Sequence, residues 1–203
     1  MKLTTTELVY INEAGKALKQ KDFIIIDNYL IGLDNINNIL SYIKLDTEFV
    51  SNIINGIIIN QRALSAFIKT ISIESDFEYD KFNTVLRSVS GGELQIGFDM
   101  SLAMLACEKF KYASYLENSS RSLEYEAQDI MQKLQSMNKS DGGAGINYNG
   151  HYMVVFPSVL PSNKSDKMYI KFIDYPESNM FTAVFRVQKK KFCIMTYISY
   201  MNI

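Results

Sequence analysis

The chain has 203 residues, enough for one domain or for one domain with a small lobe. Apolar residues make up 47% of it, so the chain can bury a sizeable core, which excludes disorder throughout. The 21 Lys and Arg residues nearly balance the 22 Asp and Glu residues. This balance argues against a dedicated DNA-coating surface, and we expect no nucleic-acid partner.

Two cysteines, Cys107 and Cys193, are too few for a disulfide scaffold. We therefore expect reduced thiols. The two cysteines and the single histidine are also too widely spaced for a zinc site, so we expect no metal and no cofactor. Glu7 stands where a signal peptide would be apolar, and no apolar stretch is long enough to span a bilayer. The expected location is cytoplasmic, or exported without a cleavable signal peptide.

The residues before Pro157 contain no proline, and their apolar side chains repeat every three to four positions, as in amphipathic helices. A short helix is expected over 8–18, with the threonines at 4–6 available as caps. Longer helices are expected over about 26–43, 50–71, 76–87 and 99–116, and a sixth helix is expected to follow Ser119 and Ser120.

A glycine-rich segment at 140–145 ends the helical pattern. The β-branched and aromatic runs after it predict four strands, at 152–156, 169–174, 181–187 and 192–200. The lysine run at 189–191 indicates a solvated hairpin turn rather than a nucleic-acid patch. No internal repeat is apparent.

The predicted fold class is therefore α+β, with an N-terminal bundle of about six helices followed by a four-stranded antiparallel sheet. We expect a helical N-terminal subdomain at 1–90 and a core of helix and antiparallel sheet at 91–203, packed together as one domain.

One pair of residues suggests catalysis. If the strands at 152–156 and 169–174 form a hairpin around a loop at 157–168, His151 lies opposite Asp174, with Cβ atoms about 5 Å apart. A carboxylate at that distance fixes the histidine tautomer and raises its basicity. The alternative is structural, because a lone histidine is often simply hydrogen-bonded and an aspartate commonly begins a turn.

A helix-borne Cys, a His that begins a strand and an Asp that ends the next strand follow the order of papain-like cysteine hydrolases. Over residues 91–203, the segments GHYMVV at 150–155 and FIDYP at 172–176 resemble the His and Asp strands of bacterial virulence effectors in that clan. The segment QIGFDMSLA at 95–103 resembles the nucleophile helix, with Ile96 where the family has its cysteine.

The resemblance implies a bacterial effector- or toxin-like protein in one of two states. Either it is a hydrolase that uses Cys107 as nucleophile, His151 as general base and acid, and Asp174 to orient the histidine, or its fold has lost the nucleophile. Cys107 also fits a small core residue. The alternative function is a non-enzymatic protein-interaction module, such as an immunity protein, an adaptor or a virulence-associated binding protein. Both hypotheses expect a protein as partner or substrate.

Overall fold

The computed structural model describes residues 2–34, 39–47, 56–71, 75–80, 84–88, 92–97, 100–136, 143–155 and 165–201. The start of the helix expected at 50–71 and most of the loop expected at 157–168 lie outside these residues. Contacts divide the chain into two compact units, the first of Met1–Leu33 and Tyr42–Phe110, the second of Asp34–Ser41 and Lys111–Ile203. The division expected at residue 90 remains a prediction.

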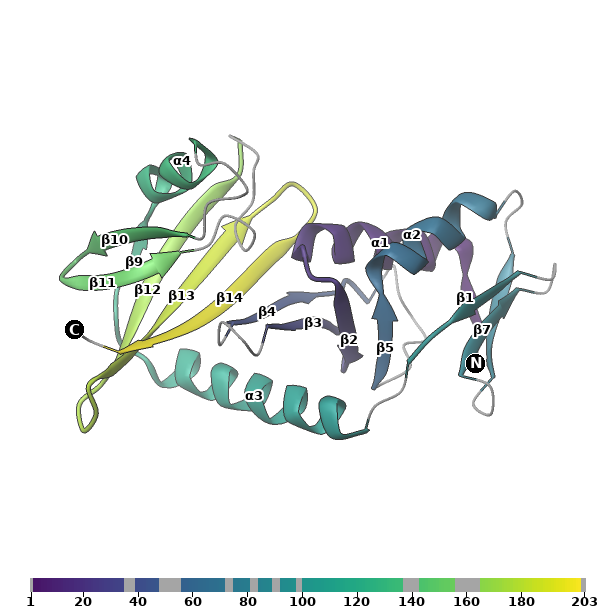
Figure 1. Ribbon diagram of the computed structural model, residues 1–203, viewed down its shortest axis with the longest axis horizontal. Helices are drawn as coiled ribbons and strands as arrows, with labels where there is room; N and C mark the ends of the chain where they lie inside the picture. Colours follow the sequence, from purple (N-terminus) through teal and green to yellow (C-terminus); the bar gives the residue numbers. More distant parts are fainter. Residues whose placement is uncertain are drawn as a thin grey trace. The chain divides into compact units, whose positions relative to one another are not determined.

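An order of one strand, one helix and three strands occurs twice in the chain, and all of it belongs to the first unit except Asp34 and residues 39–41 (Figure 1). The first copy comprises β1 (Lys2–Thr4), α1 (Thr5–Leu18), β2 (Asp22–Ile26), β3 (Tyr29–Asp34) and β4 (Ile39–Lys44). The second copy comprises β5 (Ile57–Asn60), α2 (Gln61–Thr70), β6 (Asp76–Asp80), β7 (Val85–Ser88) and β8 (Glu93–Gln95). The helix α3 (Met100–Ser119) follows.

The two copies exchange their first strands. In one sheet the order is β1-β6-β7-β8, and in the other β5, β2, β3 and β4 follow one another. The exchange is matched residue by residue, because Leu3 lies opposite Phe77 and Ile59 lies opposite Phe23. The unit is therefore an internal repeat with pseudo-two-fold symmetry, and the expectation of no internal repeat is wrong.

Equivalent caps begin the two helices. Thr4 is the N-cap of α1, and its hydroxyl accepts from the backbone N–H of Glu7 in a capping box. Asn60 is the N-cap of α2, and its side-chain oxygen accepts from the backbone N–H groups of Arg62 and Ala63. Both caps are the last residues of the exchanged strands, so one short segment sets the pairing of each strand and the start of its helix.

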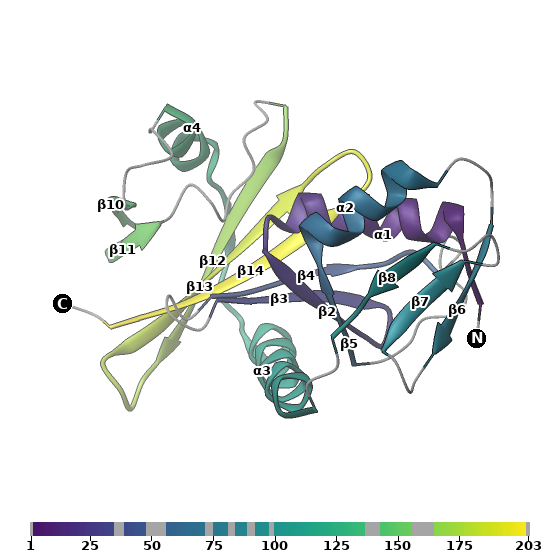
Figure 2. The ribbon, with the colours of Figure 1, turned by 45° about the vertical axis from the view of Figure 1, so that its right-hand side comes forward.

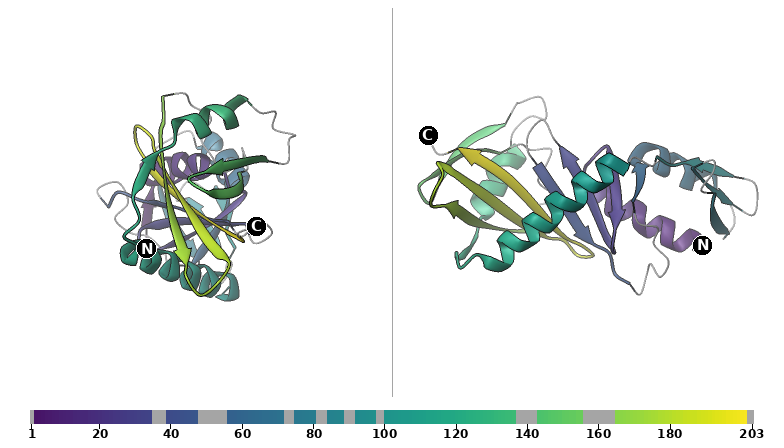
Figure 3. Two further views of the ribbon diagram at one scale, coloured as in Figure 1. Left: turned by 90° about the vertical axis from the view of Figure 1, so that its left-hand side faces the viewer. Right: turned by 90° about the horizontal axis from the view of Figure 1, so that it is seen from below.

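The second unit is built on a row of antiparallel strands in the order β14-β13-β12-β9. Its elements are β9 (Glu124–Glu126), α4 (Gln128–Ser136), β10 (Ala144–Tyr148), β11 (His151–Val155), β12 (Lys167–Tyr175), β13 (Met180–Gln188) and β14 (Cys193–Met201). The C-terminal half of α3 covers one face, where Lys171 Nζ donates to the carbonyl of Glu117 over 3.1 Å (Figure 3). The β10–β11 hairpin covers the other face, where His151 stacks on Phe172.

The predicted fold class is wrong. Instead of a six-helix bundle and one four-stranded sheet, the chain has strands through most of its length and four helices in its described part. Helices form where 8–18 and 99–116 predict them, but strands replace the helices expected over 26–43 and 76–87. Strands form at the four predicted C-terminal positions, although β11 pairs with β10 and stays outside the meander of β12, β13 and β14.

Tight turns explain the largest of these errors. Asp27 and Asn28 have φ values of 44° and 65°, which is the left-handed geometry of a two-residue hairpin turn. The flanking isoleucines are β-branched and pack well on a pleated surface. The apolar spacing of three to four residues over 26–43 extends across this hairpin, so it does not describe one helix.

Candidate nucleic-acid interface

A buried polar cluster joins α1 and α2 side by side (Figure 2). Asn12 Oδ1 accepts from Gln61 Nε2 over 2.8 Å and from Ser65 Oγ over 2.7 Å. Gly15 allows the close approach, because a Cβ at this position would stand 2.0 Å from Gln61 Oε1. Asn12 meets Ser65 while Gly15 meets Gln61, so the helices run antiparallel, and their outward faces form one surface.

That outward surface is basic. Arg62, Ala66 and Lys69 are exposed and follow the spacing i, i+4, i+7, which places them in one line along α2. The two helices hold two acids, Glu7, which is buried in the capping box, and Glu13, which is half-exposed. The exposed cations on the helices are Lys16, Arg62 and Lys69. After α1, Lys19 and Lys21 are exposed as well, next to the exposed Asp22.

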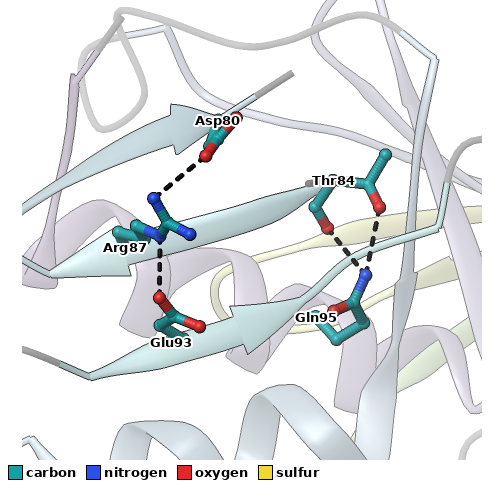
Figure 4. A network of polar contacts seen from close by, with 5 residues as sticks. All are labelled: Asp80, Thr84, Arg87, Glu93 and Gln95. Atoms are coloured by element: carbon teal, nitrogen blue, oxygen red, sulfur yellow. Dashed lines mark hydrogen bonds and ion pairs between the residues drawn. The ribbon is translucent and has the colours of Figure 1, made fainter. Parts of the chain in front are cut away.

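The face of β6, β7 and β8 turned away from α2 is acidic. Phe77 packs on Phe67 of α2 with ring centroids 5.6 Å apart, so the residues beside it in β6 point the other way. Arg87 on this outer face is 3.0 Å from Asp80 and 2.7 Å from Glu93 (Figure 4). Four acids surround this one cation among the described residues of the three strands: Asp76, Glu78, Asp80 and Glu93.

The first unit therefore has a basic face and an acidic face, and their opposite charges are not visible in the balanced net charge of the chain. The apolar spacing over 50–71 predicts one long helix, which conceals the N-cap at Asn60 and therefore the basic surface. The signal was present as Arg62 and Lys69 seven residues apart, on the opposite side of the helix from the buried Leu64 and Phe67.

His151 and Asp174 do meet, by a route that differs from the expected hairpin. His151 Nε2 lies 2.8 Å from Asp174 Oδ1, and Nδ1 lies 3.1 Å from the carbonyl oxygen of Asn149. The ring stacks on Phe172, with centroids 4.2 Å apart and planes 3° apart. The residues that bring His151 here are Asn149 and Gly150, whose positive φ values form the turn between β10 and β11.

The contacts of His151 join the strand β11 to β12. Both ring nitrogens lie within hydrogen-bonding distance of an oxygen that can accept, one on the Asp174 carboxylate and one on the backbone of Asn149. The contact between His151 and Asp174 ties the β10–β11 hairpin to β12. Tyr200 of β14 makes a second tie, because its Oη donates to the carbonyl of Val154 over 2.9 Å.

The two thiols occupy different settings. Cys107 is half-buried in the eighth position of α3, within the first unit, whereas His151 and Asp174 belong to the second. The catalytic role assigned to these three residues remains a prediction. Cys193 lies beside Arg186 in the second unit, and burial raises the pKa of its thiol. A raised pKa disfavours the thiolate, which is the reactive form.

Arg186 anchors the edge of the same sheet. It donates to both carboxylate oxygens of Glu124, over 2.7 and 2.6 Å, and its guanidinium lies 4.2 Å from the ring centroid of Tyr169. The hydrogen bond from Arg186 holds the pKa of Glu124 below its ordinary value. The described residues contain no cluster of three or more His, Cys, Asp or Glu that could hold a metal ion.

Comparison with known proteins gives solved structures alone. No family model matches the sequence, and no curated protein matches it. The chain is similar to the DNA polymerase sliding clamp from Bacillus subtilis, with 11% identity and a TM-score of 0.49 over 100% of this chain and 66% of that one. A Pseudomonas aeruginosa sliding clamp with ligand gives 11% identity and a TM-score of 0.45, over 98% of this chain and 64% of that one.

Caulobacter crescentus pol III beta gives 9% identity and a TM-score of 0.41, over 98% of this chain and 66% of that one. The chain thus spans 64 to 66% of the length of these proteins. At these identities and TM-scores the likeness supports neither a family assignment nor a function.

These findings correct the expected function. The resemblance of residues 91–203 to papain-like cysteine hydrolases is wrong: the comparisons give sliding clamps, and the strand that His151 begins pairs with β10 instead of with the strand of Asp174. The virulence-effector hypothesis derived from it is wrong as well. The comparisons give no specific support to the alternative of a non-enzymatic interaction module, nor to the exclusion of nucleic acid. No helix in the described part of the chain is long and apolar enough to cross a membrane.

Proposed function

We propose that the protein binds the phosphate backbone of duplex DNA through the outward surface of α1 and α2, as a sequence-independent tether of the sliding-clamp type. The supporting observation is the separation of charge in the first unit. Lys16, Arg62 and Lys69 are exposed on the helices, while the outer face of β6, β7 and β8 carries an excess of acids. A duplex is attracted to the first surface and repelled by the second, so the charges also orient the protein.

The shape of the helix surface favours contact with a backbone. Ala63 and Ala66 are exposed beside the cations of α2, and such small side chains let a phosphate strand approach closely. Contacts to phosphates position a protein without reading bases. We therefore expect weak binding that is independent of sequence and strongly dependent on salt.

The test is fluorescence anisotropy of labelled duplexes of two unrelated sequences, titrated with the protein at several salt concentrations. Each phosphate contact contributes about 0.9 to the slope of log affinity against log salt concentration. The triple variant Lys16→Ala, Arg62→Ala, Lys69→Ala should lower that slope by about 2 to 3 and should affect both duplexes equally.

The matched control removes three exposed lysines from the second unit, with the variant Lys133→Ala, Lys167→Ala, Lys190→Ala. It makes the same change in net charge and should keep most of the affinity and slope. The proposal fails if the two triple variants lose affinity equally, or if the unmodified protein binds neither duplex at low salt.

A further inference from the structure

The polar cluster between α1 and α2 is an expensive way to hold two helices together. Asn12 is 5% exposed, and its side-chain oxygen accepts from Gln61 and Ser65 of α2. Gln61 Nε2 also donates to Ser65 Oγ over 3.0 Å. Gln61 Oε1, in contrast, is buried and has no hydrogen-bond partner in the described part of the chain. Because a buried oxygen without a donor lowers stability, an apolar contact of the same shape would hold the helices at least as well.

The cluster defines one register of the two helices, which apolar packing alone does not. Apolar burial is non-directional, so it tolerates small slides and rotations of one helix against the other. Hydrogen bonds weaken steeply with distance and angle, so Asn12 Oδ1 receives both of its donors in a single register. The carboxamide of Gln61 adds a second constraint, because it occupies the place that a Cβ would take at Gly15. Fixing a register is the best-attested use of a buried polar group that does not add stability.

Residues of this close contact adjoin the cations of the basic surface. Lys16 directly follows Gly15 in α1, and Arg62 directly follows Gln61 in α2. Both cations are exposed. The backbone N–H of Gln61 also donates to the carbonyl of Lys21 over 2.9 Å, which ties the start of α2 to the chain just after α1. The contact between Gly15 and Gln61 therefore sets the spacing of the two cations.

We propose that the cluster of Asn12, Gln61 and Ser65 positions the basic surface for DNA. It holds Lys16 and Arg62 at one spacing, so that both cations meet phosphates of one duplex at the same time. This inference rests on the proposed function of α1 and α2. An apolar contact would keep the helices together but would allow several spacings, and binding would then have to order the surface at a cost in conformational entropy.

The test replaces the polar groups by apolar groups of similar size in the full chain, with the variant Asn12→Leu, Gln61→Met, Ser65→Ala. Its midpoint of urea unfolding should be at least as high as that of the unmodified protein. Its affinity for a labelled duplex at low salt should nevertheless fall about threefold to tenfold, because the surface is no longer preorganised. The slope of log affinity against log salt concentration should fall by about 1, the contribution of one phosphate contact.

The matched control is the variant Ser41→Ala, Thr196→Val in the second unit. These two buried hydroxyls lie 3.0 Å apart, so the variant also replaces a buried polar contact by an apolar one. It leaves α1 and α2 as they are and should change neither the affinity nor the salt slope.

A second measurement does not involve DNA. Nitroxide labels on Lys16→Cys and Ala66→Cys, in a background of Cys107→Ser and Cys193→Ser, report the distance between α1 and α2 by double electron–electron resonance. One narrow distribution of distances is expected, and the apolar triple variant should broaden it. Gly15→Ala keeps every polar group and every cation but fills the place of the carboxamide, so it should broaden the distribution and weaken DNA binding as well. It takes over the test if the triple variant does not fold.

Two results overturn the positioning role. One is a distribution that stays narrow in the apolar triple variant and in Gly15→Ala. The other is a broadened distribution with the affinity and the salt slope unchanged, or with losses no greater than those of the control. Failure of the proposed function looks different, because the unmodified protein then binds no duplex at low salt, while the label distances still decide whether the cluster fixes the register.

Discussion

The two copies of the repeat in the first unit share one plan but differ in what covers them. Both begin with a short strand that ends in an N-cap, at Thr4 and Asn60, and both pair that strand with the second strand of the other copy. Phe23 and Phe77 lie at equivalent positions and are 1% and 0% exposed. The face of each sheet toward the helices is therefore apolar in both copies.

The outer faces of the two sheets are different. In the first copy, Phe110 of α3 lies 4.7 Å from Tyr29 and 5.0 Å from Tyr42 between ring centroids, so α3 covers the strands. In the second copy the outer face carries Arg87 and its acidic partners and is left to water. The same topology thus tolerates an apolar or a charged outer face, and the covering element decides which one the sequence needs.

The largest expected effect comes from breaking the equivalence of Ile24 in β2 and Glu78 in β6, which occupy matched positions on the two outer faces. Ile24 is 3% exposed, so Ile24→Ala should lower the free energy of unfolding by about 2 to 5 kcal/mol. Glu78 is exposed, so Glu78→Ala should change it by about 0.5 kcal/mol or less. Urea unfolding followed by circular dichroism measures both free energies of unfolding. Similar losses for the two variants would contradict the conclusion that only the outer face of the first copy is covered.

The N-caps provide an intermediate effect that should be the same in both copies. Thr4→Ala and Asn60→Ala should each lower the free energy of unfolding by about 1 kcal/mol, because each leaves N–H groups in the first helical turn without their acceptor. Thr4→Ser and Asn60→Asp keep an acceptor and are the matched controls. A loss at one cap and none at the other would show that the two helices do not depend on their caps in the same way.

Whether a strand is covered on one face or on both also explains which elements could be predicted from the sequence. The N-cap among the threonines at 4–6, the helix expected at 99–116 and the hairpin turn at 189–191 rest on local signals and are confirmed. Strands covered on both faces, such as β2 and β4, lack the alternation that identifies a strand, so their isoleucines were read as helical. A local pattern did not predict the exchange of β1 and β5, because each pairs with a strand of the other copy that is distant in sequence. The pairing of β11 with β10 did have a local signal, in the turn at Asn149 and Gly150.

The same limit applies to the functional residues. The sequence pairs His151 with Asp174 on an expected hairpin of their two strands, whereas they meet through the turn at Asn149 and Gly150, a dipeptide typical of two-residue hairpin turns. The basic surface could not be inferred from the net charge, because Lys16 and Arg62 face away from the acids of β6 and β8 only once the fold is formed.

The smallest expected effect concerns Arg87, whose counterpart in the first copy is the fully buried Ile31. Arg87 makes ion pairs with Asp80 and Glu93, but its side chain is 47% exposed, so water and salt screen both contacts. Arg87→Ala should therefore lower the free energy of unfolding by at most about 1 kcal/mol at low salt, with a smaller loss at high salt. Urea unfolding at two salt concentrations measures this, with Arg87→Lys as the control that keeps the charge. A loss comparable to that of Ile24→Ala would mean that the outer face of the second copy is covered as well.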